Sequence, residues 1–280
     1  MERRNSTRSD APRKSGRTTG RNQSPFKRTV KKAKPARLEN GPDDGTVRLN
    51  KYIANSGVCS RREADTFIKT GLVTVNGKIV TDMGVKIDPV KDEIKFNGER
   101  LKGEKPVYIV MNKPKNYVTT MSDSHAANLV IDLISKEKCP ERIFPVGRLD
   151  KATTGVLLFT NDGKMAEKLT HPAYKVRKIY QVTLDKNLKK ADFDAILEGF
   201  TLHDGEIHAD ALSYIDGDQK EVGIEIHSGR NRIVRRIFEH FDYKVKKLDR
   251  VYFAGLTKKN LKRGQWRFLT EKEINLLRMG

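Results

Sequence analysis

The second half of the chain alternates segments of two hydrophobic periods, and this constrains the fold more than any other feature. KIYQVTL, residues 178–184, repeats apolar side chains at every second position, which is the period of a half-buried strand. KKADFDAILEGF, residues 189–200, repeats them at the spacing of a helix. Residues 105–280 are therefore expected to form one mixed α and β domain, with further strands in VYIVMNK, VLLFTND and VGIEIHS and further helices in KMAEKLTH and NRIVRRIFEHF.

A smaller unit precedes this domain and carries helix and hairpin signals in a short span. Apolar residues recur at helical spacing over 49–54, and Gly57 ends that helix. Ser60 starts a second helix, with Glu63 three positions later in the capping-box arrangement. VTVNGKIV, residues 73–80, indicates two strands joined by a tight Asn-Gly turn. Two helices and a hairpin are therefore expected.

Charge marks a third zone at the N-terminus. Residues 1–45 carry thirteen Lys or Arg against five Asp or Glu, a balance of +8 within a whole-chain balance of +20. Large apolar residues are nearly limited to Phe26, Val30 and Leu38, too few to offset the entropy of ordering the segment. A disordered basic arm that grips nucleic-acid phosphates is expected. The alternatives are a solvated tail without a task and a high charge that serves solubility alone.

Cysteine and motif usage argue against several classes of protein. With Cys59 and Cys139 as the two cysteines, the sequence has no disulfide framework or cysteine-rich zinc pattern, which fits a reducing cytoplasm. Apolar runs are too short to cross a bilayer, and no signal peptide is seen. Glycine-rich nucleotide loops are absent, which argues against a methyltransferase. His203 and His208 lie near acidic residues at spacings that match no metal template, and we interpret them as exposed loop histidines.

The stretch VGRLDKATTG, residues 146–155, raises the question of what Asp150 does. Aspartate very often caps a helix or turn by accepting hydrogen bonds from free backbone N–H groups, and Asp150 taken alone is best read in that way. The alternative is a carboxylate held in place for chemistry. Two later segments favour this alternative.

The first segment is KIYQVTL, where the alternation puts Tyr180 on one face with Val182 and Leu184; core packing is its alternative role. The second is EIHSGRNRIVRRIFEHF, residues 225–241, where a strand leads through a Ser-Gly pair into a helix. Its apolar residues form a buried stripe, and its arginines gather on the remaining surface. Such a concentration of positive charge calls for anions, and both RNA phosphate and a carboxylate of the protein are candidates.

Four motifs, taken in order, resemble those of RsuA-type pseudouridine synthases, the rRNA-modifying branch with an S4 RNA-binding domain in front: GRLDKATTGVLLFTNDG, KIYQVTL, SGRNRIVRRIFEHF and VKKLDRVYFAGLTKKNLKRGQWRFLTEKEINLL. RLNKYIANSGVCSRREADTFIKTGLVTVNG resembles the S4 domain itself. The likeness spans residues 48–278 and is nearer to the RluB and RluF members. It implies an α+β fold in which the arm at 1–45 is followed by a helix-helix-hairpin S4 domain at 46–103. A catalytic domain with a mixed, largely antiparallel sheet follows at 105–280.

The resemblance also implies roles for individual residues. Asp150 matches the catalytic aspartate, Tyr180 the tyrosine that stacks on the flipped uracil, and Arg235 the arginine that pairs with the aspartate. Arg148 matches the arginine that displaces the target base. Basic and polar residues of the S4 unit and of the arginine-rich loop complete the expected RNA-binding set: Arg48, Lys51, Ser60, Arg61, Arg62, Lys69, Lys78, Arg230, Asn231, Arg232 and Arg236.

Two positions depart from the family pattern. Ile233 stands where relatives usually carry glutamine, which puts one polar contact in doubt. Asn116 stands where glycine is common, a mild change because asparagine tolerates the left-handed conformation.

The implied function is the isomerisation of one uridine of rRNA, expected in the 23S molecule, to pseudouridine, without a cofactor or a metal. The implied partner is rRNA or a pre-ribosomal particle, and the enzyme is expected to be a cytoplasmic monomer. A non-catalytic RNA-binding or ribosome-assembly protein on the same scaffold is the alternative, and a pocket from which Asp150 points away would favour it.

Overall fold

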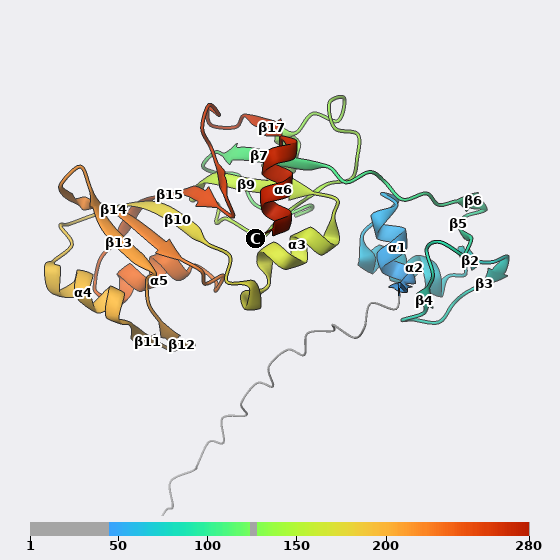
Figure 1. Cartoon of the computed structure of the whole chain (residues 1–280), viewed down its shortest axis with the longest axis horizontal. Helices are drawn as coiled ribbons and strands as arrows, with labels where there is room; N and C mark the ends of the chain where they lie inside the picture. The colour runs from blue at the N-terminus through green and yellow to red at the C-terminus, as the bar shows by residue number, and fades with distance from the viewer. Residues whose placement is uncertain (1–44, 124–127, 280) are drawn as a thin grey trace, which may run out of the picture. The chain divides into compact units, whose positions relative to one another are not determined.

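The computed structural model describes residues 45–123 and 128–279 (Figure 1). The predicted basic arm lies outside the described residues, apart from Gly45. No helix in the described part is long and apolar enough to cross a membrane. Cys59 and Cys139 are both buried and free.

The N-terminal unit forms as the local signals predict. The Ser60 hydroxyl accepts a hydrogen bond from the Glu63 amide at 3.2 Å, and the Glu63 carboxylate accepts one from the Ser60 amide at 2.6 Å, which completes the capping box. Asn76 and Gly77 both have positive φ, at 52° and 78°, as a tight hairpin turn requires. The elements are β1 Val47–Arg48, α1 Leu49–Asn55, α2 Arg61–Lys69, β2 Val73–Val75, β3 Lys78–Ile79, β4 Lys86–Ile87, β5 Ile94–Phe96 and β6 Glu99–Arg100.

This unit has a small core of its own. β3, β2, β5 and β6 form a four-stranded antiparallel sheet, and β1 pairs with β4. Leu49 and Ile53 of α1 pack with Ala64 and Ile68 of α2 in a cluster that draws on residues 47–101 alone. The helices therefore present their charged faces away from this core.

The C-terminal part is built on one nine-stranded sheet, whose main path runs β13-β14-β10-β15-β9-β7-β17. β16 pairs with β15, and β8 pairs with β9. All pairs are antiparallel except β15 with β9, so the prediction of a mixed, largely antiparallel sheet is confirmed. The strands are β7 Tyr108–Lys113, β8 Phe144–Pro145, β9 Thr154–Thr160, β10 Lys178–Leu184, β13 Ala211–Ile215, β14 Asp218–Ile226, β15 Val245–Phe253, β16 Leu256–Thr257 and β17 Trp266–Phe268.

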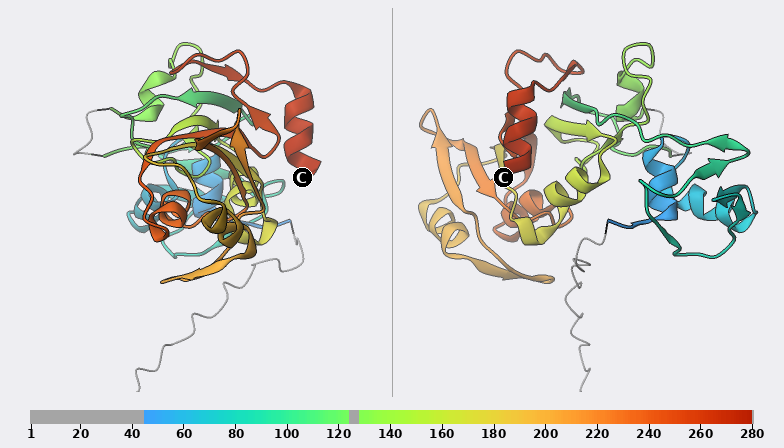
Figure 2. Two further views of the ribbon diagram at one scale, coloured as in Figure 1. Left: turned by 90° about the vertical axis from the view of Figure 1, so that its left-hand side faces the viewer. Right: turned by 45° about the vertical axis from the view of Figure 1, so that its right-hand side comes forward.

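Helices and a second hairpin surround the sheet. Phe193 and Ile196 of α4 and the apolar stripe of α5 pack on β10 and β14, and both helices lie on one side of these strands (Figure 1). Leu169 of α3 and Leu277 of α6 pack on β7 and β9, beside which α6 is seen in Figure 2. These elements are α3 Gly163–Thr170, α4 Lys190–Glu198, β11 Phe200–Leu202, β12 Gly205–Ile207, α5 Ile233–His240 and α6 Glu271–Met279, with short 3-10 turns at η1 Val130–Leu133 and η2 Pro172–Tyr174.

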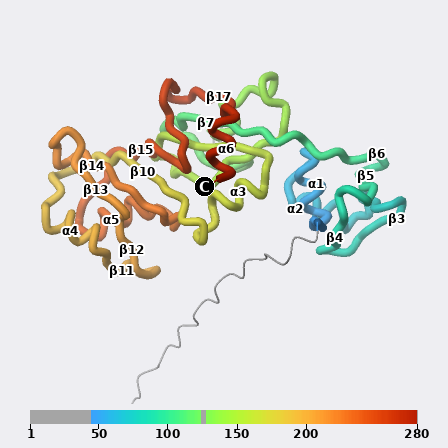
Figure 3. Tube along the Cα trace, in the orientation of Figure 1, coloured from blue at the N-terminus to red at the C-terminus, as the bar shows by residue number. Residues whose placement is uncertain are grey.

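The parallel junction between β15 and β9 depends on a glycine. Arg250 pairs with Gly155 across it, and β15 lies between β10 and β9 in the sheet. Figure 3 traces β15 next to β10. Gly155 has φ of +109°, and a Cβ placed there would lie 2.1 Å from the Arg250 carbonyl oxygen. Only glycine allows the two backbones to approach this closely. The junction brings the centre of β15 beside the loop that ends in β9.

Candidate active site

Asp150 lies in the loop between β8 and β9, and the backbone of that loop is held from several sides. The Thr153 amide donates to the Asp150 carbonyl at 2.9 Å, which closes a turn. The Asn116 amide donates to the Lys151 carbonyl at 2.8 Å. The Thr119 hydroxyl donates to the Leu149 carbonyl at 2.8 Å. The position of Asp150 is therefore fixed without any use of its own side chain.

Lys113, at the end of β7, is the main tie on this loop. Its ammonium group donates to the carbonyl oxygens of Thr153 at 2.9 Å, Pro114 at 3.1 Å and Asp150 at 3.2 Å. The side chain is fully buried. Burial lowers the pKa of Lys113 to about 8, although the Asp150 carboxylate raises it in part.

The carboxylate of Asp150 is not a cap. It accepts no hydrogen bond from the residues that the structure describes, and its nearest cations are two arginines of the α5 region. Arg235 Nε lies 3.8 Å and Arg232 Nη1 lies 3.9 Å from Asp150 Oδ2. The side chain remains 34% exposed, so its oxygens are available to a ligand. This geometry removes the turn-cap interpretation of Asp150.

Arg235 is held for this contact. Its Nη1 donates to the Val245 carbonyl at 3.0 Å, and the side chain is 11% exposed, so it does not lie on the outer surface expected for it. Its buried Nε has no hydrogen-bond partner among the described residues. Burial, and then the charge of Arg232, lower the pKa of Arg235, whereas Asp150 raises it. The predicted pairing of Arg235 with Asp150 is thus seen as a charge contact beyond hydrogen-bond length.

A cavity of about 270 Å³ opens beside these groups. Asp150 and Arg148 line it from the β8–β9 loop, Tyr180 from β10, and Arg250 from β15. Residues 228–234, which include Arg230, Asn231 and Arg232, line it from the loop before α5 and from the first turn of that helix. The volume is near the lower end of the range for small-ligand pockets.

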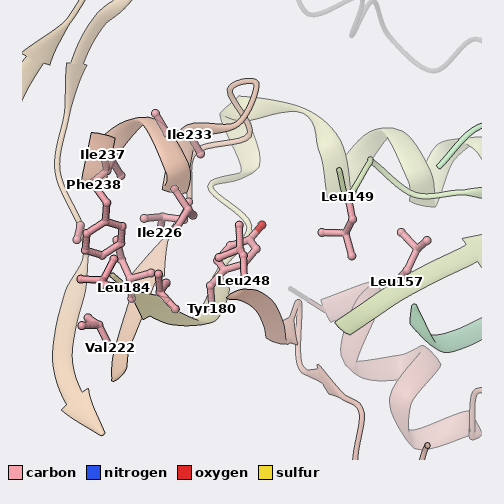
Figure 4. Packing of buried hydrophobic residues seen from close by; sticks show 14 of the residues in the cluster. Leu149, Leu157, Tyr180, Leu184, Val222, Ile226, Ile233, Ile237, Phe238 and Leu248 are labelled. Atoms are coloured by element: carbon pink, nitrogen blue, oxygen red, sulfur yellow. The ribbon is translucent and has the colours of Figure 1, made fainter. Parts of the chain in front are cut away.

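Tyr180 combines both roles considered for it. The expected alternation is confirmed, because Tyr180, Val182 and Leu184 are buried and the residues between them are less so. Figure 4 shows Tyr180 between the group around Leu184 and the residues Leu149 and Leu157, with its hydroxyl directed away from Leu184 and toward the side on which Leu149 lies. The ring therefore packs on the core while its outer part lines the cavity.

The remaining predicted residues of the catalytic part divide into two groups. Arg148 is exposed and makes no hydrogen bond or ion pair with the described residues, so its guanidinium is available at the cavity. Arg230 and Arg236 instead grip the β11–β12 turn: Arg236 Nη1 donates to Asp204 at 2.8 Å and Arg230 Nη1 at 3.0 Å. The Arg236 hydrogen bond is the main cause that lowers the pKa of Asp204, to about 2. These two arginines therefore stabilise the fold, in addition to any contact they make with a ligand.

The predicted residues of the S4 unit lie on α1, α2, the hairpin and their ends. Arg61, Arg62 and Lys69 are exposed on α2, and Lys78 is exposed on β3. Ser60 uses its hydroxyl for the capping box. Lys51 is half-buried on α1, and Arg48 is exposed just before that helix. Their RNA contacts stay predictions.

The sequence did not predict three basic residues of the site: Lys113, Lys178 and Arg250. Besides Lys113, Lys178 lines the cavity and donates to the carbonyls of Val176 and His227, both at 2.8 Å. Burial lowers the pKa of Lys178 to about 8, with a further contribution from Arg250. The sequence did contain one indication of such a residue, a basic side chain within an apolar strand, where a charge needs a specific partner.

The two departures from the family pattern have clear places. Asn116 has φ of 72°, so it occupies the left-handed conformation that asparagine tolerates, as predicted. Ile233 is buried and lines the cavity from the start of α5. The cavity wall is therefore apolar at the position where relatives usually carry glutamine.

One group in the described part of the chain has the composition of a metal site. Ligand atoms of His208, Asp210 and His227 lie within 4.8 Å of one another. Asp210 Oδ1 lies 2.8 Å from His227 Nδ1, within hydrogen-bond distance. His208 is exposed as predicted, but it lies in this group rather than apart from it. None of the three lines the cavity.

The sequence matches two family models and several known proteins. Residues 107–240 match the family model for RNA pseudouridylate synthase, and residues 47–94 match that for the S4 domain. The chain is 39% identical to ribosomal large subunit pseudouridine synthase B of Bacillus subtilis, over 82% of this chain and 95% of that one.

Two further relatives extend the comparison. The chain is 36% identical to the dual-specificity RNA pseudouridine synthase RluF of Escherichia coli K12, over 82% of this chain and 78% of that one. A crystal structure of a pseudouridylate synthase superposes with a TM-score of 0.59 at 30% identity, and it covers 82% of this chain and 99% of its own.

Proposed function

The chain belongs to the RNA pseudouridylate synthase family and carries an S4 domain, and from this premise we propose that it converts one uridine of ribosomal RNA to pseudouridine. The substrate within that class is proposed to be large-subunit 23S rRNA, in a free or pre-ribosomal form. The name of the Bacillus subtilis relative supports the large subunit. The basic surface of α2 and the whole-chain charge of +20 support a polyanionic partner.

One observation carries the proposal. The Asp150 carboxylate faces two guanidinium groups beside a cavity that Tyr180 also lines, and it accepts no hydrogen bond from the described residues. An aspartate that served the fold would spend its oxygens on backbone N–H groups. Here the backbone of the loop is tied by other residues, and the carboxylate is left to meet a substrate.

The reaction requires the base to leave the RNA helix, because stacking and pairing bury every atom involved. Extrusion of a nucleotide costs a few kcal/mol. Arg148, exposed at the cavity and unpaired within the described part of the chain, is proposed to take the place of the extruded base. Tyr180 then offers the flipped uracil an aromatic face, since stacking of a base on an aromatic ring contributes about 1 to 3 kcal/mol.

Asp150 is proposed to act as an anion on the flipped nucleoside. Arg235 and Arg232 place positive charge 3.8 and 3.9 Å from Asp150 Oδ2, which stabilises negative charge at that oxygen. An anionic carboxylate at this place can attack C1′ of the ribose, attack C6 of the uracil, or remove a ribose proton. Each route breaks the N1–C1′ bond, after which the uracil turns and C5 joins C1′.

The test is the substitution Asp150→Asn. It keeps the size of the side chain and removes its charge, so we expect product formation to fall below detection while RNA affinity stays within a few fold. Tritium release from rRNA labelled at C5 of uridine measures the turnover. Asp216→Asn, in the β13–β14 turn, is the matched control and should retain wild-type turnover. Turnover by Asp150→Asn at the wild-type rate would overturn the assignment.

The alternative of a non-catalytic RNA-binding protein has the weaker support. It accounts for the basic surface but gives no reason for a carboxylate left without hydrogen bonds beside a cavity. Asp150 lines that cavity instead of pointing away from it, which is the observation that would have favoured the alternative.

A further inference from the structure

Arg250 is a buried cation in the wall of the cavity. It lies at the centre of β15 and is 3% exposed. On one side it pairs with Gly155 of β9, and on the other with Tyr180 of β10. Its Nε donates to the Val156 carbonyl at 2.8 Å, and its guanidinium stacks 4.4 Å from the centre of the Phe253 ring. The side chain is thus fixed in place by two strands and a ring.

The charge of Arg250 is not compensated by a carboxylate. Within residues 45–123 and 128–279 it forms no ion pair, and its buried Nη2 has no hydrogen-bond partner. A buried charge without a partner is strongly destabilising, and so is a buried donor left unsatisfied. For stability alone, an apolar residue at this position would be more favourable. A guanidinium kept at this place is therefore expected to have a task in the cavity.

The polar group best placed to use it is the hydroxyl of Tyr180. Residues paired across antiparallel strands have their Cβ atoms about 5 Å apart on the same face. Tyr180 and Arg250 form such a pair next to an irregularity in the β10–β15 register, and both line the cavity. Burial lowers the pKa of Arg250, and the Tyr180 side chain is the group that offsets this effect.

We propose that Arg250 is a positioning residue that acts through Tyr180: its free Nη2 donates to the phenol oxygen, so that the proton of the hydroxyl points into the cavity. The inference rests on the proposed function and deepens it. The same cation then stabilises negative charge on the oxygen whenever that proton is transferred.

The reaction requires one proton to be added at N1 and one to be removed from C5, and the Tyr180 hydroxyl can carry out both transfers. Once C5 has joined C1′, C5 still carries a proton and N1 lacks one. The Tyr180 hydroxyl gives its proton to N1, which leaves a phenolate beside Arg250. The phenolate then takes the proton from C5, and the electron pair of the C5–H bond forms the C5–C6 double bond while the N1–C6 pair returns to N1. The phenol is restored and no other reactant is consumed.

A double-mutant cycle tests the coupling. Tyr180→Phe and Arg250→Gln are each expected to slow single-turnover tritium release about 100-fold, the scale of general acid–base catalysis. Because both act on one hydroxyl, the double variant should be no slower than the slower single variant. Multiplicative losses would overturn the inference. If the wild-type protein releases no tritium from any rRNA, the proposed function fails instead.

An isotope effect separates this role from a merely structural one. Deuterium at C5 should slow Arg250→Gln more than it slows the wild type, because proton loss from C5 becomes limiting. Val182→Ala is the matched control: it removes buried packing from the strand that carries Tyr180 but leaves Arg250 and its contact with the Phe253 ring in place, so it should lower the melting temperature without raising the isotope effect. Arg250→Lys, which keeps a charge, serves if the glutamine variant does not fold, and it should restore part of the rate. An isotope effect unchanged in every folded Arg250 variant would contradict the proposal.

Discussion

At the scale of single residues, the site depends on a fully buried lysine. Lys113 donates to four backbone carbonyls, three of them in the turn that carries Asp150, from a position with no exposure to solvent. A methylene chain without an ammonium group would leave those carbonyls unsatisfied and the turn free to shift. Displacement of a reacting group by about 1 Å costs on the order of 100-fold in rate.

We therefore expect Lys113→Met to lower the single-turnover rate about 100-fold. Affinity for rRNA should stay within about threefold, because Lys113 is buried and contributes no phosphate contact. Filter binding and tritium release measure the two quantities separately. An equal loss in affinity and rate would mean that Lys113 acts on binding instead.

The same lysine predicts a dependence on pH. Lysine is charged below its pKa, and the pKa of Lys113 is about 8, so the ammonium group is present at pH 7 and lost as the pH rises through 8. The rate should fall over that range as the loop loses a donor and Asp150 loses a nearby positive charge. Lys178 also has a pKa of about 8 and is the competing source. The decline should persist in Lys178→Met, and its disappearance there would reassign it to Lys178.

The sequence predicted some residues of the candidate site and missed others, and the two groups differ in whether a local sequence pattern marks them. Asp150 and Tyr180 stand in recognisable motifs, and the Asn116 backbone conformation follows from its residue type. The partners that matter most lie far away in the sequence: Asp150 is 37 positions from Lys113, and Tyr180 pairs with Arg250 from another strand. Tertiary contacts of this kind leave no local pattern in one sequence.

At the scale of secondary-structure elements, strong periodicity predicted position well. β10 begins and ends where the alternation of KIYQVTL does, and α5 carries the predicted apolar stripe. The β11–β12 hairpin was not predicted, because its short polar strands lack either period. The pairing of β15 with β9 was also out of reach, since it joins segments about 90 residues apart.

The β9–β15 junction gives a prediction about stability. Gly155→Ala would place a methyl group 2.1 Å from a backbone oxygen at a φ of +109°, so we expect a loss of roughly 4 kcal/mol in unfolding free energy. Gly217→Ala is the control, because its φ of +75° is also unfavourable but no atom lies within 4 Å; it should cost about 1 to 2 kcal/mol. Urea denaturation followed by circular dichroism measures both. Equal losses would show that the close approach does not matter.

The tie between α5 and the β11–β12 turn separates structural from RNA-binding arginines. Arg236→Gln breaks the hydrogen bonds to Asp204 and should lower the melting temperature while rRNA affinity stays within about threefold. Arg148→Gln, which breaks no contact within the described part of the chain, should leave the melting temperature unchanged and reduce turnover. The reverse pattern would support Arg236 as a member of the RNA-binding set and argue against Arg148.

At the scale of the whole molecule, the chain consists of two parts that match different families. Two family matches, over 47–94 and 107–240, fall within the predicted domains at 46–103 and 105–280. The exposed arginines of α2 have no counterpart in the chemistry of the cavity. We propose that they contact phosphates of the substrate RNA.

This division predicts a change in salt dependence. Each phosphate contact adds about 0.7 to 0.9 to the slope of log affinity against log salt concentration. Neutralising Arg61 and Arg62 to glutamine should therefore reduce the slope by about 1 to 2. Neutralising Lys189 and Lys190 at the start of α4 removes the same charge and should leave the slope nearly unchanged. Equal effects of the two pairs would indicate that net charge alone binds the RNA.

The most direct measurement of the central claim is a map of pseudouridine across rRNA by carbodiimide-stop sequencing. Cells that lack the gene are compared with cells given back either the wild-type chain or its Asp150→Asn variant. One large-subunit uridine should be unmodified without the gene, modified again with the wild-type chain, and unmodified with the variant. An identical map in all strains, or modification restored by Asp150→Asn, would contradict the account.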